Sequence, residues 1–372
     1  MGGRFLELSM SDAFPRPEAA TAPTWSDPLR QQRFEQWLAE LAPSHGLDLS
    51  SLRVASADAS FRRYLRVDAA PPARSFVVMD APAPQENTEP FVRIARLLQA
   101  AGLRVPTVHA WDEAQGFVLL EDFGDAVLIR SLQSERPAAA LPELRVAIAE
   151  LVRLQTASRA GVLPPYDAAL LRRELQLFPD WYVGQHRQMQ LSPQQLAVLT
   201  QAFDILVERN LASPSVYVHR DFMPRNLMCL PQEPDRLGVL DFQDAVYGPI
   251  TYDIASLMRD AFLSWDEQVV IDVTARYWEA ARKANLPVDA DFGEFYRGVE
   301  WMGLQRHLKV AGIFARLSLR DGKEKYLADT PRFIGYILHG ASRYRELVPL
   351  ARLVEQIEGT QTAQGWAFGR VG

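Results

Sequence analysis

The sequence predicts an α+β protein built from two lobes, a small β-rich lobe followed by a larger, mostly helical one. Three observations lead to this expectation. Short runs rich in β-branched and aromatic residues gather before residue 122. After Gly124, long segments repeat apolar residues at the spacing of a helix. A short group of strand-like runs near residue 220 interrupts these helical segments.

We expect three parts along the chain: a flexible leader over residues 1–25, the first lobe over 26–122 and the second lobe over 123–372. The leader has three prolines and many small residues between positions 13 and 24, a composition typical of loosely ordered chain. It lacks the continuous apolar segment of a secretion signal.

The first lobe opens with an amphipathic helix predicted over residues 28–41, where Phe34, Trp37 and Leu38 fall on one helical stripe. The Pro-Ser-His-Gly stretch at 43–46 is expected to stop it. Strands are predicted over residues 61–67, 74–79 and 117–121, with a helix over about 89–101 that ends at Gly102.

The second lobe is predicted from apolar residues that recur every three or four positions. This spacing indicates helices over residues 142–155, 193–211, 266–285, 292–316 and 331–346. Ser192, followed by a proline at the first helical position, marks the start of the second of these helices. Short strands are predicted over residues 216–219, 227–230 and 237–241.

Composition and charge exclude several classes of protein. With 46 acidic and 40 basic residues the net charge is −6, which argues against a nucleic-acid partner. The single cysteine, Cys229, forms no internal disulfide, which favours a reducing compartment. No apolar run approaches the length of a membrane span. We therefore expect a cytoplasmic protein with no membrane partner, present as a monomer or weak dimer.

The group of strands near residue 220 carries the residues suited to chemistry. The stretch YVHRDFMPRNLM, at 217–228, places Asp221 five residues before Asn226, and Asp241 follows at the end of a later strand. Phosphoryl transfer needs a carboxylate to orient or deprotonate the attacking hydroxyl and oxygen ligands to hold Mg²⁺ against the phosphates. Asp221 suits the first role, and Asn226 with Asp241 suits the second.

Each of these residues also has an ordinary structural interpretation. An aspartate after a strand is usually a turn former, and an asparagine in a loop usually caps the backbone. His219 is expected to pack and bond behind the loop as structural support. The phosphoryl-transfer interpretation is favoured because all the parts occur together, in order, after a β-rich lobe.

The segments VHRDFMPRNLM and VLDFQDAVYGPITYDIASL resemble the aminoglycoside phosphotransferase and choline kinase branch of the protein-kinase-like fold. The resemblance implies a bilobal kinase that uses ATP and Mg²⁺. It implies that Asp221 is the catalytic base, that Asn226 and Asp241 bind the metal, and that Asp253 braces the loop. For Asp253, a helix N-cap is an equally good interpretation.

The nucleotide-binding part departs from the family pattern. Residues 56–64, which the resemblance places over the phosphates, contain no glycine, and the strand Phe76–Asp80 lacks the family's lysine. Arg63, Arg66 or Arg225 is a candidate replacement for that lysine. Glu121 to Phe123 falls at the family's hinge, whose backbone contacts adenine. The implied nucleotide contacts are Ser60, Phe61, Arg63, Glu121, Phe123 and Arg225.

A narrower resemblance comes from the segments DASFRRYLRV, LLEDFGD, RRELQLFPDWY and QRHLKVAGIFARL. Together with the lysine-free strand, they resemble the bacterial anomeric amino-sugar kinases of peptidoglycan recycling, which phosphorylate the C1 hydroxyl of N-acetylmuramic acid and N-acetylglucosamine. The resemblance implies an acceptor-binding wall formed by Glu174, Asp180, Trp181 and Tyr182. Ordinary core packing at a helix end explains these aromatic residues equally well.

Two other functions stay open from the sequence. A kinase for an amino alcohol such as choline, or for an aminoglycoside, is possible because Trp181 and Tyr182 suit a quaternary ammonium. The absence of acidic residues after Glu358 counts against an aminoglycoside. A non-catalytic kinase-like scaffold is suggested by the missing lysine, but the complete set of Asp221, Asn226 and Asp241 argues against it.

Overall fold

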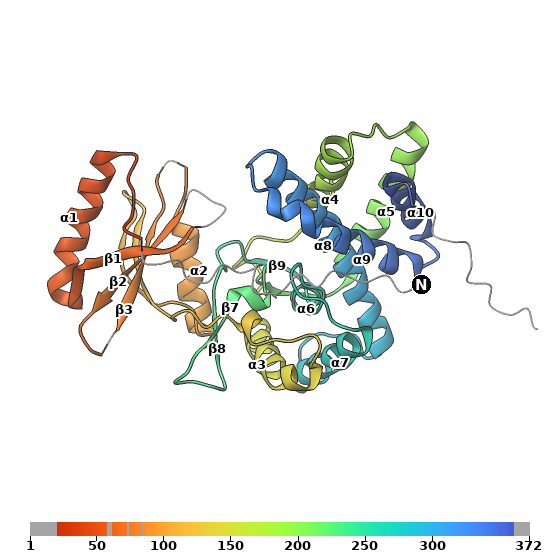
Figure 1. Cartoon of the computed structure of the whole chain (residues 1–372). Coiled ribbons are helices and arrows are strands. Elements are labelled where there is room, and N and C mark those ends of the chain that lie inside the picture. Colours follow the sequence, from red (N-terminus) through yellow and green to blue (C-terminus); the bar gives the residue numbers. More distant parts are fainter. Residues whose placement is uncertain (1–20, 58–61, 73, 84, 361–372) are drawn as a thin grey trace, which may run out of the picture. The chain divides into compact units, whose positions relative to one another are not determined.

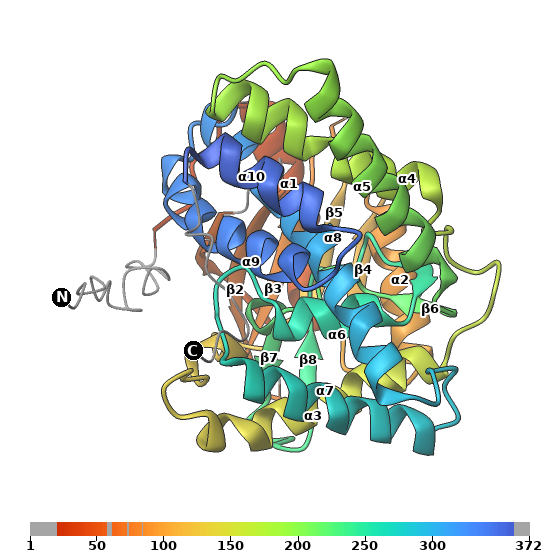
Figure 2. The ribbon, with the colours of Figure 1, turned by 90° about the vertical axis from the view of Figure 1, so that its right-hand side faces the viewer.

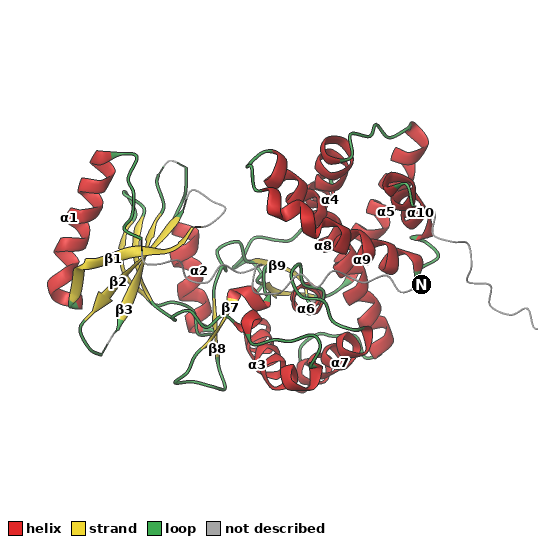
Figure 3. Cartoon of the chain, in the orientation of Figure 1, coloured by secondary structure: helices red, strands yellow, loops and turns green. Residues whose placement is uncertain are grey.

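The structure is a computed structural model that describes residues 21–57, 62–72, 74–83 and 85–360. It divides into two compact units. The first takes the residues up to Leu97 together with Val105–Gly124, and the second takes Leu98–Arg104 and the residues from Asp125 onward. The larger sheet belongs to the first unit, whereas helices make up most of the second (Figure 3). Each unit is described in turn.

The first unit is a five-stranded sheet in the order β1-β2-β3-β5-β4, with all neighbouring strands antiparallel. Helix α1 (Pro28–His45) packs on this sheet (Figure 1), and α2 (Glu89–Ala100) follows β3 in the chain. The strands are β1 Leu47–Ala57, β2 Arg63–Ala69, β3 Ser75–Asp80, β4 Val108–Asp112 and β5 Phe117–Glu121.

Helix α1 is set by its caps and its apolar stripe. The Asp27 side chain accepts a hydrogen bond from the backbone N–H of Leu29 at 2.9 Å, and Gly46 ends the helix with a φ of 64°. Pro43 lies inside the last turn, so the actual stop is the left-handed glycine. Phe34 and Leu38 are fully buried against side chains of the central strands, listed as Leu65, Val67, Phe76, Val78, Phe117 and Leu119.

The two edge strands of the sheet, β1 and β4, were not predicted from the sequence. The run Leu47–Ala57 contains three serines and an aspartate, and its pairing with β2 shifts register between Asp48 and Arg53. Strand β4 is five residues long and none of its side chains is fully buried. Edge strands bury less surface than central ones, so their sequences alternate less strictly and carry a weaker signal.

The second unit is organised around its longest helix, α8 (Phe292–Leu319), which contacts α4, α5, α6, α7 and α9 (Figure 2). Its middle, from Trp301 to Lys309, is buried on every side. The remaining α-helices and the π-helical turn are α3 Pro137–Thr156, α4 Ala168–Leu175, η2 Phe178–His186, α5 Pro193–Ala212, α6 Thr251–Met258, α7 Glu267–Lys283, α9 Thr330–Ser342 and α10 Val348–Glu358, and the short 3-10 helices are η1 Leu128–Arg130, η3 Pro224–Asn226 and η4 Glu324–Asp329.

Two antiparallel ribbons lie inside this helical unit. Strand β6 (Ser215–Val218) pairs with β9 (Val246–Pro249), and β7 (Leu227–Cys229) pairs with β8 (Leu237–Val239). Strand β9 was not predicted, and neither were the eight-residue helices α4 and α6, which are too short for a clear period. Among the described residues, no helix combines the length and apolar character needed to cross a membrane.

Candidate active site

The two ribbons bring the three predicted catalytic and metal-binding residues together. Asp221 follows β6, Asn226 directly precedes β7, and Asp241 lies two residues after β8. The Asn226 Nδ2 donates to the backbone carbonyl of Asp221 at 2.9 Å and to Oδ2 of Asp241 at 3.3 Å. The Leu240 N–H also donates to the Asn226 carbonyl at 2.9 Å. These bonds fix the position of each residue relative to the other two.

The loop at Asp221 requires an unusual backbone. Arg220 has a φ of 77° and Asp241 has a φ of 64°, values that non-glycine residues rarely adopt. Asp253, the third residue of α6, holds the first of these turns. Its carboxylate accepts hydrogen bonds from the backbone N–H of His219 at 2.7 Å and of Arg220 at 3.0 Å. Asp253 therefore lies inside the helix, whose N-cap is Ile250, and its carboxylate contacts the loop; its role as a brace stays a prediction.

Burial sets the protonation of both supporting residues. Asp253 is completely buried, and this raises the pKa of its carboxyl to about 7, although the two backbone N–H donors partly oppose the rise. Burial also lowers the pKa of His219 to about 4, so the imidazole is neutral near pH 7. The His219 ring packs edge-on against Phe222 with the ring centres 5.8 Å apart.

The buried side chains of Glu174, Arg306, Lys309 and Tyr166 lie behind the loop, and the half-buried Arg220 pairs with one of them. Glu174 Oε1 accepts from Arg220 Nη2 at 2.5 Å and lies 3.0 Å from Lys309 Nζ, and the Tyr166 hydroxyl donates to the other carboxylate oxygen. Arg306 Nη1 donates to the Arg220 carbonyl at 2.7 Å. We call Glu174, Arg220, Asp253, Arg306 and Lys309 the loop cluster.

The loop cluster keeps its central carboxylate ionised. Burial opposes ionisation of Glu174, but the Lys309 ammonium and the Arg220 guanidinium outweigh it and lower the pKa of the carboxyl. The Glu174 side chain is only 6% exposed, so these pairs are weakly screened by water. The cluster therefore ties the backbone of the loop to helices α4, α6 and α8.

The four predicted acceptor-binding residues are placed differently. Glu174 is buried and accepts a hydrogen bond from Arg220 of the loop. Asp180 is exposed on η2 and accepts from Gln176 Nε2 at 2.7 Å. Tyr182 is buried, and its hydroxyl donates to Glu358 of α10 at 2.9 Å. Trp181 is half-buried. Their roles in acceptor binding stay predictions.

The sequence analysis missed Arg306 and Lys309, which belong to the loop cluster, and Tyr166, whose hydroxyl donates to Glu174. A signal was present: two cations occur in the otherwise apolar middle of a long helix, in the run LQRHLKVAG. Buried cations require buried acceptors or carboxylates. That requirement points to an acidic partner elsewhere in the chain but does not identify Glu174, because only the fold places α4 beside α8.

The predicted nucleotide contacts are spread over both units, and Ser60 and Phe61 lie outside the described residues. Glu121 accepts from the Thr107 hydroxyl at 2.9 Å, and Phe123 is half-buried in the same unit. Arg225 is exposed in the second unit, with its guanidinium 4.7 Å from the centre of the Phe262 ring.

Arg63 and Arg66, two candidates for the lysine's replacement, pair with carboxylates inside the first unit. The strand that lacks lysine ends instead in a buried acid, Asp80, which binds both Arg30 and Arg63. The Arg63 Nε lies 3.0 Å from Asp80 Oδ2. Arg66 Nε lies 2.6 Å from a carboxylate oxygen of Asp122. The charge on this strand is therefore a buried carboxylate that two arginines neutralise.

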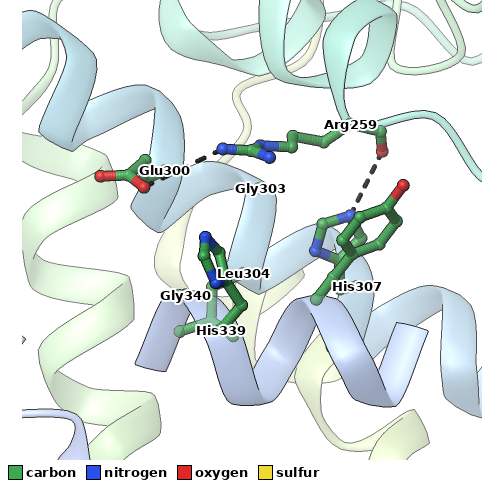
Figure 4. A pocket seen from close by; sticks show the side chains of 8 residues that line it. Arg259, Glu300, Gly303, Leu304, His307, His339 and Gly340 are labelled. Atoms are coloured by element: carbon green, nitrogen blue, oxygen red, sulfur yellow. Dashed lines mark hydrogen bonds and ion pairs between the residues drawn. The ribbon is translucent and has the colours of Figure 1, made fainter. Parts of the chain in front are cut away.

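A second group of charged residues surrounds another part of α8 (Figure 4). Arg259 Nη2 lies 2.9 Å from Glu267, and Arg343 Nη1 lies 2.9 Å from the same carboxylate. Glu300 pairs with Arg343 as well. The His307 ring contacts the Arg259 carbonyl at 3.2 Å. We call Arg259, Glu267, Glu300 and Arg343 the helix cluster, since its ion pairs join α7, α8 and the ends of α6 and α9.

Asn226 and Asp241 suit a hard cation. Because the Asn226 amide nitrogen donates to the loop and to Asp241, its amide oxygen remains available as a ligand beside the exposed Asp241 carboxylate. Mg²⁺ usually takes one or two protein oxygens and completes its shell with water and phosphate. Within the described ranges, no three His, Cys, Asp or Glu side chains form a metal-binding group of their own.

Comparison with known proteins identifies the family. The family described as Phosphotransferase enzyme family matches residues 51–290. N-acetylmuramate/N-acetylglucosamine kinase of Neisseria meningitidis serogroup B is 46% identical over 341 residues, covering 91% of this chain and 99% of the relative. The protein of the same name from Pseudomonas aeruginosa is 46% identical over 339 residues, covering 89% and 98%.

Solved structures share the fold at low sequence identity. Ethanolamine kinase from Plasmodium vivax matches with a TM-score of 0.59 at 12% identity, covering 94% of this chain and 99% of that one. An aminoglycoside phosphotransferase solved with ADP matches with a TM-score of 0.54 at 14% identity, covering 81% and 97%. The predicted family and the kinase-like α+β fold are thus confirmed. The chain belongs to the Phosphotransferase enzyme family.

Proposed function

We propose that this kinase transfers the γ-phosphate of ATP to the C1 hydroxyl of N-acetylmuramic acid and N-acetylglucosamine, as a cytoplasmic step of cell-wall sugar recycling. The observation that carries the acceptor is the match to kinases of that name along nearly the whole chain. The choice of the C1 hydroxyl rests on the narrower resemblance described for the sequence.

Asp221 is the proposed base. Its carboxylate orients the attacking hydroxyl and accepts its proton as the bond to phosphorus forms. The bond from Asn226 to its carbonyl and the brace from Asp253 to the two preceding N–H groups support this role, because they hold the loop in one conformation. A base held in place loses less entropy when the acceptor arrives.

The residues present fit a magnesium site, and we propose that Asn226 and Asp241 hold the ion. When bound, Mg²⁺ neutralises charge on the transferring phosphate groups. The Gln243 Nε2 donates to Asp241 Oδ1 at 2.8 Å, and the Asn226 amide donates to its Oδ2. Both carboxylate oxygens of Asp241 are thus oriented by neighbouring side chains before any ligand arrives.

Arg225 is our candidate for part of the charge that the missing lysine supplies in the family. It is exposed one residue before Asn226, and in the described part of the chain no carboxylate lies within ion-pair distance of it. Arg63 and Arg66 are already paired with carboxylates in their unit. An unpaired guanidinium beside the metal-binding asparagine suits a phosphate oxygen.

The acceptor is tested by ADP release from purified protein with ATP and Mg²⁺, using N-acetylmuramic acid, N-acetylglucosamine, choline and kanamycin in turn. We expect turnover with the two amino sugars and none with the amines. Turnover with choline or kanamycin alone would overturn the acceptor assignment and leave the kinase. ATP binding without turnover on any acceptor would favour the non-catalytic scaffold.

The metal site has its own test. In the Asp241→Ala variant we expect the Mg²⁺ concentration for half-maximal activity to rise at least about tenfold, because one of two protein ligands is lost. The Asp235→Asn variant, in an exposed turn between β7 and β8, serves as the control. An unchanged Mg²⁺ titration in Asp241→Ala would exclude Asp241 as a ligand.

A further inference from the structure

A cavity of about 790 Å³ lies in the second unit, apart from the residues assigned above. It is lined by the end of α5, the turn into β6, the start of α6, the segment after α7, the first half of α8 and the segment after α9; Figure 2 labels these elements. Its volume falls in the range of sites that hold a small organic ligand. We ask what chemistry its walls offer.

The cavity wall carries charge of both signs, with four arginines and the carboxylates of Asp289, Glu294 and Glu346, and two of the arginines are unpaired in the described structure. Arg209 and Arg345 both line it, both are exposed, and no carboxylate of the described residues pairs with either. Two further arginines that line the cavity already pair with carboxylates. Arg297 lies 3.3 Å from Glu294, and Arg343 pairs with Glu267 in the helix cluster. The free guanidinium groups suit a phosphate or carboxylate, to which arginine makes two parallel hydrogen bonds.

Buried polar atoms without partners lie in the same wall. Trp301 is 4% exposed and Thr251 is 2% exposed, and both line the cavity. Neither the Trp301 Nε1 nor the Thr251 Oγ1 has a hydrogen-bond partner in the described structure. Buried donors are nearly always satisfied, and leaving one unpaired costs about 1–3 kcal/mol. These two atoms are therefore polar groups that the described part of the chain leaves unsatisfied at the cavity wall.

The wall also has an aromatic surface. Trp301 and Tyr344 meet edge to face, with ring centres 5.3 Å apart, and Arg209 lies 6.0 Å from the Trp301 ring centre. Aromatic faces beside polar donors are the usual surface for a sugar ring, whose C–H groups pack on the ring while its hydroxyls bond outward. The combination of unpaired arginines with an aromatic wall therefore favours a sugar that carries an anionic group.

The cavity is distinct from the catalytic loop. Pro214 and Ile250, which line it, flank the Ser215–Pro249 end of the β6–β9 ribbon. The loop begins at His219, beyond the Val218–Val246 end. The strand between these ends spans roughly 10 Å at about 3.3 Å per residue. A ligand in the cavity is thus not the acceptor held at Asp221.

We propose that this cavity is a second ligand site that binds a phosphorylated sugar, with Arg209 and Arg345 holding the phosphate and the half-buried Tyr344 packing on the ring. The inference does not rest on the proposed acceptor, because it uses neither Asp221 nor the metal-binding residues. Its test is a binding measurement that needs no turnover, so the failure of either proposal leaves the other standing.

The test is calorimetric titration of the full chain with N-acetylglucosamine 1-phosphate, in the absence of nucleotide. We expect the Arg209→Ala, Arg345→Ala double variant to bind at least about tenfold more weakly than the unsubstituted protein. Arg352→Ala, an exposed arginine on α10, is the matched control and should bind normally. Trp301→Phe, which keeps a ring and removes the indole N–H, should weaken binding by about threefold or more.

Three outcomes would overturn the proposal. The first is no measurable binding by the unsubstituted protein. The second is equal affinity in the double variant, which places the probe at the catalytic loop instead. The third is inorganic phosphate binding as tightly as the sugar phosphate, which leaves the aromatic wall without a role. Normal ADP release by the double variant with the accepted sugar would show that its fold and catalytic loop are intact.

Discussion

The loop cluster and the helix cluster both use α8, yet they differ in what they hold. The loop cluster pairs side chains that are between 6% and 18% exposed and fixes a backbone turn at Arg220. The helix cluster joins regular helices, and its exposure is uneven: Arg259 is 11% and Glu300 is 7% exposed, whereas Glu267 is 27% and Arg343 is 34% exposed. Burial of one charge network next to a strained turn is costly, and such an arrangement is typical of a functional site.

This difference indicates where the loss of one charged side chain should lower the free energy of unfolding the most. Ion pairs at a surface add little, since water already solvates their charges. Buried pairs cost a large desolvation energy and are strongly coupled, so removal of one member leaves the others uncompensated. We therefore expect changes in the loop cluster to affect both folding and activity, and changes at the more exposed Glu267 or Arg343 of the helix cluster to affect folding less and activity little.

The largest expected effect comes from the residue that the loop cluster positions. Asp221→Asn keeps the volume of the side chain but removes the base, so turnover should fall at least about 100-fold. Steady-state kinetics measures this loss, and circular dichroism shows that the fold is retained. Asp235→Asn, an exposed aspartate, should keep full activity. Near-normal turnover in Asp221→Asn would show that Asp221 is not the catalytic base.

The next effect compares one carboxylate from each cluster. Glu174→Gln leaves Arg220 and Lys309 buried without their shared counter-charge, and we expect the free energy of unfolding to fall by about 3–5 kcal/mol. Glu267→Gln, at a more exposed site where water screens part of the interaction, should cost less, about 2 kcal/mol. Urea unfolding measures both. Equal losses would show that burial does not separate the clusters.

The same two variants test whether the loop cluster positions Asp221 or only stabilises the fold. At a temperature where both variants are folded, Glu174→Gln should lower kcat while the KM for ATP stays within about twofold. Glu267→Gln should leave both unchanged. If Glu174→Gln loses stability but keeps its kcat, the loop cluster is structural and does not position Asp221.

The two clusters should also respond to pH in opposite directions. The pKa of Asp253 is raised by burial to about 7, so its contribution to stability is complete below about pH 4 and is lost as pH rises through 7. For Glu267, burial opposes ionisation, but hydrogen bonds from Tyr296 and the charge of Arg259 lower the pKa to about 2. Its contribution is present above about pH 4.5 and is lost as pH falls toward 2.

Urea unfolding between pH 4 and 7 tests this contrast. The stability of the unsubstituted protein relative to Asp253→Asn should fall with rising pH, by on the order of 1 kcal/mol per pH unit. Relative to Glu267→Gln it should stay level from pH 5 to 7 and fall only in stronger acid. A level difference for Asp253→Asn would show that this carboxyl does not titrate in the range.

The smallest effect is expected at the rim of the helix cluster. His339 is 54% exposed and lies 3.8 Å from Glu267. Its ring contributes little packing, and partial burial and the nearby Arg343 lower the pKa of its imidazole, so His339→Ala should change the free energy of unfolding by less than about 0.5 kcal/mol. Thermal unfolding checks this. A loss above about 2 kcal/mol would mean that the rim of the cluster is as tightly coupled as the loop.

The sequence predicted long, regular elements better than short or irregular ones. Helices such as α5 and α8 were found because their apolar period persists over many residues. The strands β1, β4 and β9 were missed, since none combines length with strict alternation. Helix α1 was predicted to stop before Pro43, but the structure ends it at His45 because Gly46 supplies the left-handed cap.

For the site, the motif spacing identified the residues that meet at the ends of short strands. Asp221, Asn226 and Asp241 lie together because each sits directly beside a ribbon. The partners behind the loop were not predictable, because Glu174, Arg306 and Lys309 come from two helices far apart in the sequence. Only tertiary packing decides which buried charges meet.

Phosphorus NMR of the reaction products tests the central claim most directly. The protein is incubated with ATP, Mg²⁺ and N-acetylmuramic acid or N-acetylglucosamine, beside Asp221→Asn as the control. We predict a sugar 1-phosphate from the unsubstituted protein and no such signal from the variant. Phosphate on another hydroxyl would contradict the proposed C1 specificity, and an equal signal from Asp221→Asn would contradict the assignment of the base.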